Sequence, residues 1–109
     1  MITCFIRYEI DPFQRDEFAQ YARNWGQAIP DCGADLIGYY APHEGSATTA
    51  YGVYSLPSLA DYEVYRARLA AHPLGQDNYA FAKEKRFIRR EDRIFLKCAS
   101  TPHAKRNTG

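Results

Sequence analysis

The chain has 109 residues, which is enough for one domain and too few for two. Its 14 basic and 13 acidic side chains leave a formal charge of +1, so the composition gives no reason to expect nucleic acid as a partner. No apolar run reaches the ~18 residues of a membrane span, and no span is expected. The three widely spaced cysteines form no C-x-x-C motif, which predicts no metal site and favours a reducing, cytoplasmic location.

The first half of the chain predicts a strand, a helix and a second strand. Polar and apolar residues alternate over residues 2–10, which is typical of a strand with Ile2, Cys4, Ile6, Tyr8 and Ile10 on one face. Asp11 and Pro12 predict a helix start, and Pro30 and Gly33 predict its end. Apolar side chains recur between them at helical spacing: Phe13, Phe18, Tyr21, Ala22, Trp25 and Ile29. Residues 35–41 predict the next strand.

A hairpin and another helix follow. Residues 48–56 read as the third strand, and the turn before them contains Pro42, Glu44, Gly45 and Ser46. Ser58 and Asp61 have the spacing of a capping box, which predicts a helix start at Ser58. Leu59, Tyr62, Tyr65 and Leu69 form the apolar face of this helix, while Glu63, Arg66 and Arg68 fall on its polar side.

The last part of the chain predicts a helix, a strand and a tail. His72-Pro73 breaks the preceding helix, and a further helix is expected over residues 73–85. Residues 87–97 predict the fourth strand, whose charged middle (89–93) indicates an edge strand or a network of ion pairs across a dimer. We expect one domain over residues 1–99 and a disordered polar tail over 100–109.

The order of the elements predicts an α+β fold. This order fits a ferredoxin-like βαββαβ arrangement with an antiparallel sheet in the strand order 4-1-3-2 and one extra helix before the last strand. The helices cover one face of such a sheet, yet these strands carry apolar side chains on both faces. A second copy of the chain would cover the other face, so we expect a homodimer that encloses a barrel. Residues Thr3, Phe5, Arg7 and Glu9 would face that barrel.

Two segments resemble a known family. Residues 38–45 read Gly-Tyr-Tyr-Ala-Pro-His-Glu-Gly, residues 54–66 read Tyr-Ser-Leu-Pro-Ser-Leu-Ala-Asp-Tyr-Glu-Val-Tyr-Arg, and both resemble the NIPSNAP family. The opening residues 1–8 and the late Glu91, Arg93 and Phe95 fit as well, so the resemblance covers about residues 1–97. It implies a dimeric α+β barrel, a superfamily that includes cofactor-independent monooxygenases, isomerases and haem-dependent enzymes. It implies no particular reaction and transfers no catalytic residue.

Several polar residues are candidates for a site at one rim of the barrel. His43 has a reference pKa suited to proton transfer, although a turn histidine can equally hold the hairpin or the dimer. Glu44 would orient His43 or stay solvated. Arg7 would bind an anionic group of a ligand, or pair with an acidic residue such as Glu9 or Glu91. Three tyrosines would line the pocket or pack in the interface: Tyr39, Tyr40 and Tyr51.

Two classes of function remain open from the sequence. One is a homodimeric binding module that holds a small molecule in the barrel. The other is a cofactor-independent monooxygenase or isomerase acting on a small aromatic or enolisable substrate, with His43 moving a proton and Arg7 holding an anion. Neither requires a metal or a bound cofactor.

Overall fold

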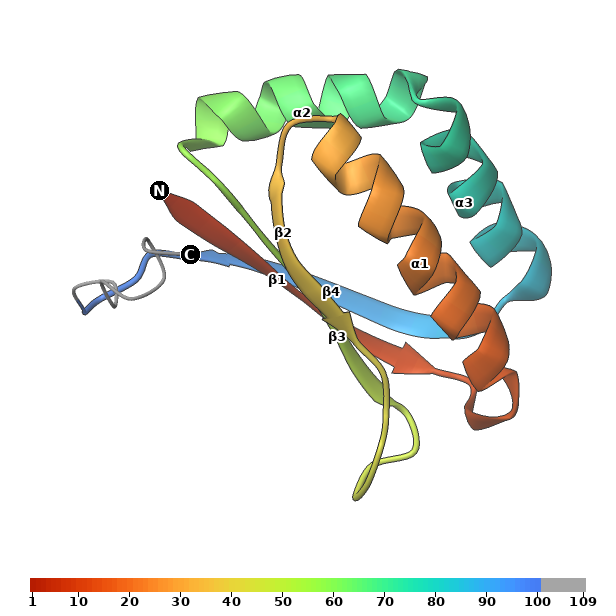
Figure 1. Ribbon diagram of the computed structural model, residues 1–109. Coiled ribbons are helices and arrows are strands. Elements are labelled where there is room, and N and C mark those ends of the chain that lie inside the picture. The colour runs from red at the N-terminus through yellow and green to blue at the C-terminus, as the bar shows by residue number, and fades with distance from the viewer. Residues whose placement is uncertain (101–109) are drawn as a thin grey trace.

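In the computed structural model, which describes residues 1–100, three helices lie on one face of a four-stranded antiparallel sheet (Figure 1). The strand order is β2-β3-β1-β4, as the sequence predicted. The elements in chain order are β1 (Ile2–Ile10), the 3-10 turn η1 (Pro12–Gln14), α1 (Arg15–Asp31), β2 (Asp35–Tyr40), β3 (Thr49–Leu56), α2 (Leu59–Ala71), α3 (Pro73–Lys85) and β4 (Ile88–Leu96). The predicted tail, apart from residue 100, lies outside the described residues.

The central strand β1 sets which side chains face the helices. Its apolar positions are buried beneath the helices, as predicted from the alternation. Ile6 lies opposite Gly52 on β3 and Arg93 on β4. Tyr8 lies opposite Ala50 and Glu91 in the same way. Since paired residues of an antiparallel sheet share a face, Glu91 and Arg93 also point to the helix side.

The start and end of α1 differ from the sequence-based prediction. Asp11 caps as expected, because its carboxylate accepts a hydrogen bond from the Phe13 backbone N–H at 2.9 Å, but the first turn is 3-10 and leaves Phe13 93% exposed. Phe13 is therefore not part of the buried stripe. The helix also continues through Pro30, which the sequence predicted to end it. A proline in the last turn removes only one helical hydrogen bond, and Gly33, at φ 99°, then turns the chain.

The two later helices are separated by His72. Ser58 caps α2 as predicted, accepting from the Asp61 backbone N–H at 3.2 Å and donating to its carboxylate at 2.7 Å. His72 ends α2, and its Nδ1 accepts from the Gly75 backbone N–H at 3.3 Å, so the side chain caps the start of α3. Its Nε2 lies 3.2 Å from the carboxylate of Asp31 at the end of α1. The sequence predicted that His72-Pro73 breaks the helix; in the structure the His72 side chain also caps the N–H end of α3.

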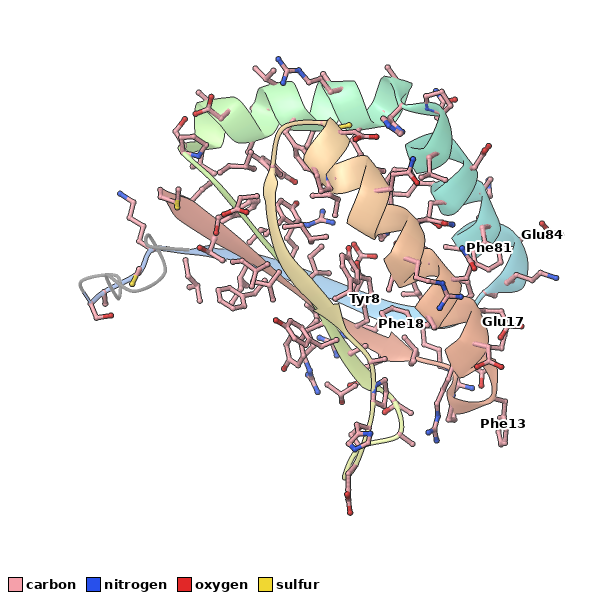
Figure 2. The ribbon with its side chains drawn as sticks, viewed as in Figure 1. Tyr8, Phe13, Glu17, Phe18, Phe81 and Glu84 are labelled. Atoms are coloured by element: carbon pink, nitrogen blue, oxygen red, sulfur yellow. The ribbon has the colours of Figure 1, made fainter. Side chains whose placement is uncertain are left out.

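A buried asparagine fastens α3 to α1. Asn78 is fully buried, its Nδ2 donates to the Tyr21 carbonyl at 2.9 Å, and its Oδ1 accepts from Asn24 at 2.9 Å. Three large aromatic side chains fill the neighbouring core: Tyr8, Phe18 and Phe87 (Figure 2 labels the first two).

None of the helices in the described part of the chain has the length and apolar character that crossing a membrane requires.

Candidate functional site

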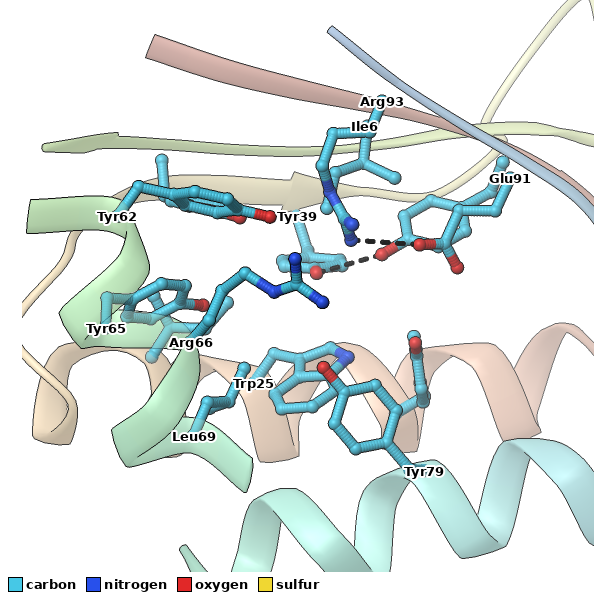
Figure 3. Close-up of a pocket in the computed structure, with 14 residues that line it drawn as sticks. Ile6, Trp25, Tyr39, Tyr62, Tyr65, Arg66, Leu69, Tyr79, Glu91 and Arg93 are labelled. Atoms are coloured by element: carbon cyan, nitrogen blue, oxygen red, sulfur yellow. Dashed lines mark hydrogen bonds and ion pairs between the residues drawn. The ribbon is translucent and has the colours of Figure 1, made fainter. Parts of the chain in front are cut away.

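A cavity of about 70 Å³ lies between the sheet and the three helices (Figure 3). On the scale of about 10–15 Å³ for one water molecule, it holds roughly five waters or the inner part of a small ligand. Its walls are mainly aromatic, with seven tyrosines: Tyr8, Tyr21, Tyr39, Tyr54, Tyr62, Tyr65 and Tyr79. Three charged side chains also line it: Arg66, Glu91 and Arg93.

The floor of the cavity depends on a close approach between Tyr39 and Gly52. A Cβ atom at Gly52 would lie 2.6 Å from the Tyr39 ring, so only glycine lets that ring lie against the strand. The Tyr39 hydroxyl then lies 3.0 Å from the Tyr8 hydroxyl, within hydrogen-bonding distance. This pair joins β2 to the central strand on the cavity side.

Helix α2 contributes one wall through its helical spacing. Tyr62, Tyr65, Arg66 and Leu69 are three or four residues apart and therefore share a face. The Arg66 guanidinium lies over the Tyr62 ring, 5.7 Å from its centre, in a cation–π contact. Arg66 has no carboxylate within ion-pair distance among residues 1–100. Its charge is therefore left available at the cavity.

Helix α1 contributes Trp25, whose indole N–H has no acceptor within hydrogen-bonding geometry, although the Tyr21 hydroxyl lies close enough for the indole to lower the pKa of that tyrosine. Trp25 is 3% exposed and lies among the lining side chains (Figure 3). Its Nε1 is the one buried side-chain polar atom within residues 1–100 that lacks a hydrogen-bond partner. Because an unsatisfied buried donor costs about 1–3 kcal/mol, the position is suited to an acceptor atom of water or of a ligand.

Five of the tyrosine hydroxyls of the cavity are held in the protonated state. Burial raises the pKa of Tyr21 to about 12, although the nearby indole of Trp25 and the hydroxyl of Tyr8 act in the opposite direction. Burial likewise raises the pKa of Tyr8, Tyr39, Tyr54 and Tyr65. These groups offer neutral hydroxyls for hydrogen bonding, and they cannot supply a negative charge near neutral pH.

An ion pair lies on the β4 side of the cavity. Arg93 Nη2 is 3.0 Å from Glu91 Oε2, and each side chain keeps 35% of its surface exposed. Burial lowers the pKa of Arg93, but Tyr54, Tyr62 and Glu91 raise it by more, so the side chain stays a cation. The exposed lining residues Arg66, Tyr79, Glu91 and Arg93 therefore mark the mouth of the cavity, since most of the others are buried. No group of three potential metal-ligating side chains occurs within the described residues.

Comparisons with known proteins agree with this architecture. The NIPSNAP family model matches residues 3–102. The chain belongs to the NIPSNAP family. No match was found among curated proteins.

Solved structures of other NIPSNAP proteins share the fold. A NIPSNAP protein of unknown function from Agrobacterium tumefaciens is 20% identical, with a TM-score of 0.77 over 94% of this chain and 92% of that one. An uncharacterised NIPSNAP domain protein from Burkholderia xenovorans is 23% identical, with a TM-score of 0.73 over 94% and 100%. A protein from Nitrosomonas europaea, provisionally named an antibiotic biosynthesis monooxygenase, is 9% identical, with a TM-score of 0.71 over 92% and 100%.

The predicted site residues of this NIPSNAP chain fall into three separate places. Tyr39 lines the cavity on the helix side. Arg7, Tyr51 and Tyr40 are successive partners across β1, β3 and β2, so they lie together on the opposite face of the sheet. Arg7 pairs there with Glu9 at 3.0 Å, one of the alternatives raised from the sequence.

The other two predicted residues lie in the connection between β2 and β3. His43 and Glu44 are both exposed, and Gly45 at φ 91° turns the chain beside them. Their proposed roles in proton transfer and ligand binding stay predictions. The structure brings neither residue into the wall of the cavity.

Sequence reasoning missed the charged residues of the cavity. It assigned Arg66 to the polar side of its helix, and it assigned Glu91 and Arg93 to the charged middle of an edge strand. A signal was present for the last two, because residues 91, 93 and 95 alternate with 92, 94 and 96 on a strand that pairs with β1. Fixing that register would have placed Glu91 and Arg93 beside Tyr8 and Ile6.

Proposed function

We propose that this NIPSNAP chain binds a small molecule in the cavity between the sheet and the helices. The observation that carries the proposal is the buried indole N–H of Trp25, which lacks an acceptor in a cavity lined by hydroxyls and aromatic rings. Ligand sites are typically apolar hollows with a few convergent polar groups, and this cavity has that composition. At about 70 Å³ it suits a ligand whose inner part is small and whose outer part reaches the exposed mouth.

A fragment screen tests this proposal and its location together. Ligand-observed NMR would detect binding of neutral, anionic and cationic fragments without requiring a reaction. Trp25→Phe keeps an aromatic ring but removes the N–H donor, and we expect it to weaken cavity ligands about fivefold or more, the value of one hydrogen bond. The matched control is Arg7→Ala on the opposite face, which should leave affinity unchanged.

The outcomes of this screen are separable. Loss of binding in Trp25→Phe with retention in Arg7→Ala supports the cavity. The reverse pattern would place the ligand on the face that carries Arg7, Tyr40 and Tyr51, inside the barrel expected of a dimer. A library in which no fragment binds would contradict the proposal.

We also propose a homodimer formed through the sheet face opposite the helices. That face presents Ile94 at 53% exposure and Leu96 at 49% on β4, and it also carries Tyr40 on β2 and Tyr51 on β3. Leaving such surface in water costs on the order of 25 cal/mol per Å², so a second copy that covers it gains stability. Light scattering of the purified chain distinguishes a dimer of this kind from a monomer.

The alternative function is an enzyme of the cofactor-independent monooxygenase or isomerase type. It is supported by the shared fold with the Nitrosomonas europaea protein, which by itself does not establish an activity. Because burial raises the pKa of Tyr8 and Tyr39 and keeps them protonated, proton abstraction would fall to Glu91 or to a residue brought to the substrate from elsewhere, such as His43. Oxygen uptake with an enolisable aromatic substrate, compared between the parent protein, His43→Ala and Glu91→Gln, tests this alternative. Equal rates in all three proteins would exclude both residues as the base.

A cytoplasmic location also stays a prediction. The thiols of Cys4 and Cys32 are buried in the core, where burial raises the pKa of each and keeps it in the unreactive thiol form. Fractionation of cells that express the tagged chain would test the location directly.

A further inference from the structure

The charges around the cavity do not balance. Two cations, Arg66 and Arg93, face one anion, Glu91, across its mouth. Arg93 is paired with Glu91 at 3.0 Å, whereas Arg66 has no ion-pair partner among residues 1–100 and only the Tyr62 ring beneath it. The exposed lining residues of the cavity therefore carry one positive charge in excess.

The interior cannot supply the missing anion. The hydroxyls of Tyr8, Tyr21 and Tyr39 stay protonated because burial raises their pKa values, and the indole of Trp25 adds an N–H donor. A ligand that complements both regions has a negative charge at the mouth and a compact part that accepts a hydrogen bond further in. The rings of Tyr62, Tyr65 and Trp25 suit a flat aromatic ring between these two ends.

We propose that the cavity selects a small aromatic carboxylate. When no ligand is bound, the Glu91 carboxylate pairs with Arg93 at the position that the carboxylate of the ligand would take. The inference rests on the proposed binding function and specifies the class of its ligand. A carboxylate matches the planar fork of an arginine, and the mouth offers two such forks. The Glu91 carboxylate already makes this contact, and it lies on an edge strand with 35% of its side chain exposed, so it has room to move aside.

This arrangement makes Glu91 a competitor of the ligand. The carboxylates of Glu91 and of the ligand would bind the same guanidinium, that of Arg93, and their two negative charges repel each other. Removing the charge of Glu91 therefore frees Arg93 and strengthens binding of an anion. It should have little effect on a neutral ligand of the same shape.

The test compares acids with their uncharged amides. Benzoate and benzamide have nearly the same shape, as do para-hydroxybenzoate and para-hydroxybenzamide. Trp25 is the only tryptophan in the chain and lines the cavity, so its fluorescence reports binding without a label. Calorimetry gives an independent affinity for each compound.

We expect each acid to bind about tenfold or more tightly than its amide, the equivalent of one charge-assisted hydrogen bond. Glu91→Gln should tighten binding of the acids about threefold to tenfold and leave the amides within about twofold. Arg93→Gln should remove most of the preference for the acids, whereas Arg93→Lys should restore part of it. Glu84→Gln, an exposed carboxylate of α3 away from the lining residues (Figure 2), is the matched control and should change nothing.

Three results would overturn the inference. If the amides bind as tightly as the acids, the cavity binds ligands but does not select an anion. If neither compound of a pair binds while neutral fragments do, the inference fails and the proposed binding function stands. If no fragment of any charge changes the Trp25 fluorescence or the NMR signals, both fail. Circular dichroism of every variant confirms that a lost preference does not reflect a lost fold.

Discussion

The hydroxyls of Tyr8 and Tyr39 lie 3.0 Å apart, on two strands that are not neighbours in the sheet. Strand β3 separates them, and it is Gly52 on β3 that leaves room for the Tyr39 ring to reach over. A single polar contact thus spans three strands on the cavity side. Tyr8 is buried and Tyr39 is half-buried, and desolvation raises the pKa of each.

The first prediction concerns this hydroxyl pair. Tyr39→Phe removes one partner and leaves the Tyr8 hydroxyl poorly satisfied, which should lower the free energy of unfolding by about 1–2 kcal/mol. Tyr8→Phe should have a similar cost. The double variant should cost less than the sum of the two, by about 1 kcal/mol, because no orphaned hydroxyl remains. Urea denaturation of the parent chain, the two single variants and the double variant gives the four free energies of unfolding. Strict additivity of the two single costs would show that the two hydroxyls do not interact.

The second prediction concerns Gly52. In Gly52→Ala the new methyl group would meet the Tyr39 ring at 2.6 Å, so the ring must move away from the strand. We expect a loss of stability of about 1–3 kcal/mol, as for other overpacked sites, and an altered cavity. Gly26→Ala is the matched control, since nothing lies within 4 Å of a Cβ there and α1 would gain a better helix former. Chemical denaturation should show opposite signs for the two variants, and a neutral Gly52→Ala would contradict the described position of Tyr39.

The fold was more predictable from the sequence than the site, for a physical reason. Alternation over β1 and the Ser58 cap are local signals, and a short chain with this order of elements has few compact topologies. The cavity depends on contacts between distant elements. Trp25 looks like an ordinary core residue at helical spacing, and nothing in its neighbourhood along the chain shows that its N–H lacks an acceptor.

Charged residues near an element's polar face are the hardest to place from sequence. Arg66 sits among solvent-facing positions of α2, yet its long side chain reaches back over Tyr62. Asn78, a polar residue, lies within the helix predicted over residues 73–85, and nothing in that pattern shows that it is fully buried and joins α3 to α1. The hydrophobic period and the secondary-structure propensities of a sequence predict which face of an element carries a residue. They do not predict which distant groups a long or hydrogen-bonding side chain will contact.

The third prediction is a steep loss of stability in alkali. Tyr21 has a pKa of about 12 in the folded chain and about 10 when unfolded, so the unfolded state loses its proton first. The stabilising effect is complete below pH ~10 and is lost as the pH rises from there towards 12, at about 1.4 kcal/mol per pH unit for each such group. Tyr8, Tyr39, Tyr54 and Tyr65 shift in the same direction and add to the slope.

Tyrosinate absorbance and circular dichroism, followed together against pH, test this prediction. We expect the buried tyrosines to ionise in one cooperative step that coincides with unfolding. Gradual ionisation at pH ~10 with the fold intact would show that these hydroxyls are open to solvent. Tyr21→Phe should shift the midpoint of unfolding to higher pH, because one ionising group has been removed.

The fourth prediction concerns the link between α1 and α3. Asn78→Ala removes two hydrogen bonds of 2.9 Å from a fully buried position and leaves a small void, which should cost about 2–4 kcal/mol. Asn24→Ala removes only one of these bonds at a half-buried position and should cost about 1 kcal/mol. Thermal or urea unfolding ranks the two. Equal costs would mean that the bond from Asn78 to the Tyr21 carbonyl contributes little.

The fifth prediction tests the sheet face proposed to bind a second copy. Ile94 on β4 and Val64 on α2 have nearly equal exposure in a single chain, 53% and 51%. If the open face of the sheet is the dimer interface, Ile94→Glu buries a charge without a partner and should weaken the dimer at least a hundredfold. Val64→Glu introduces the same change on the helix side and should leave association unaffected.

Light scattering and sedimentation over a range of protein concentrations give the association constants of both variants. Dissociation in Ile94→Glu alone supports a dimer through the sheet. Dissociation in Val64→Glu alone would move the interface to the helices, where it would compete with access to the cavity. Because the cavity opens on the helix side, a dimer through the sheet leaves Arg66 and Arg93 accessible, so the Ile94→Glu monomer should retain ligand affinity within about twofold.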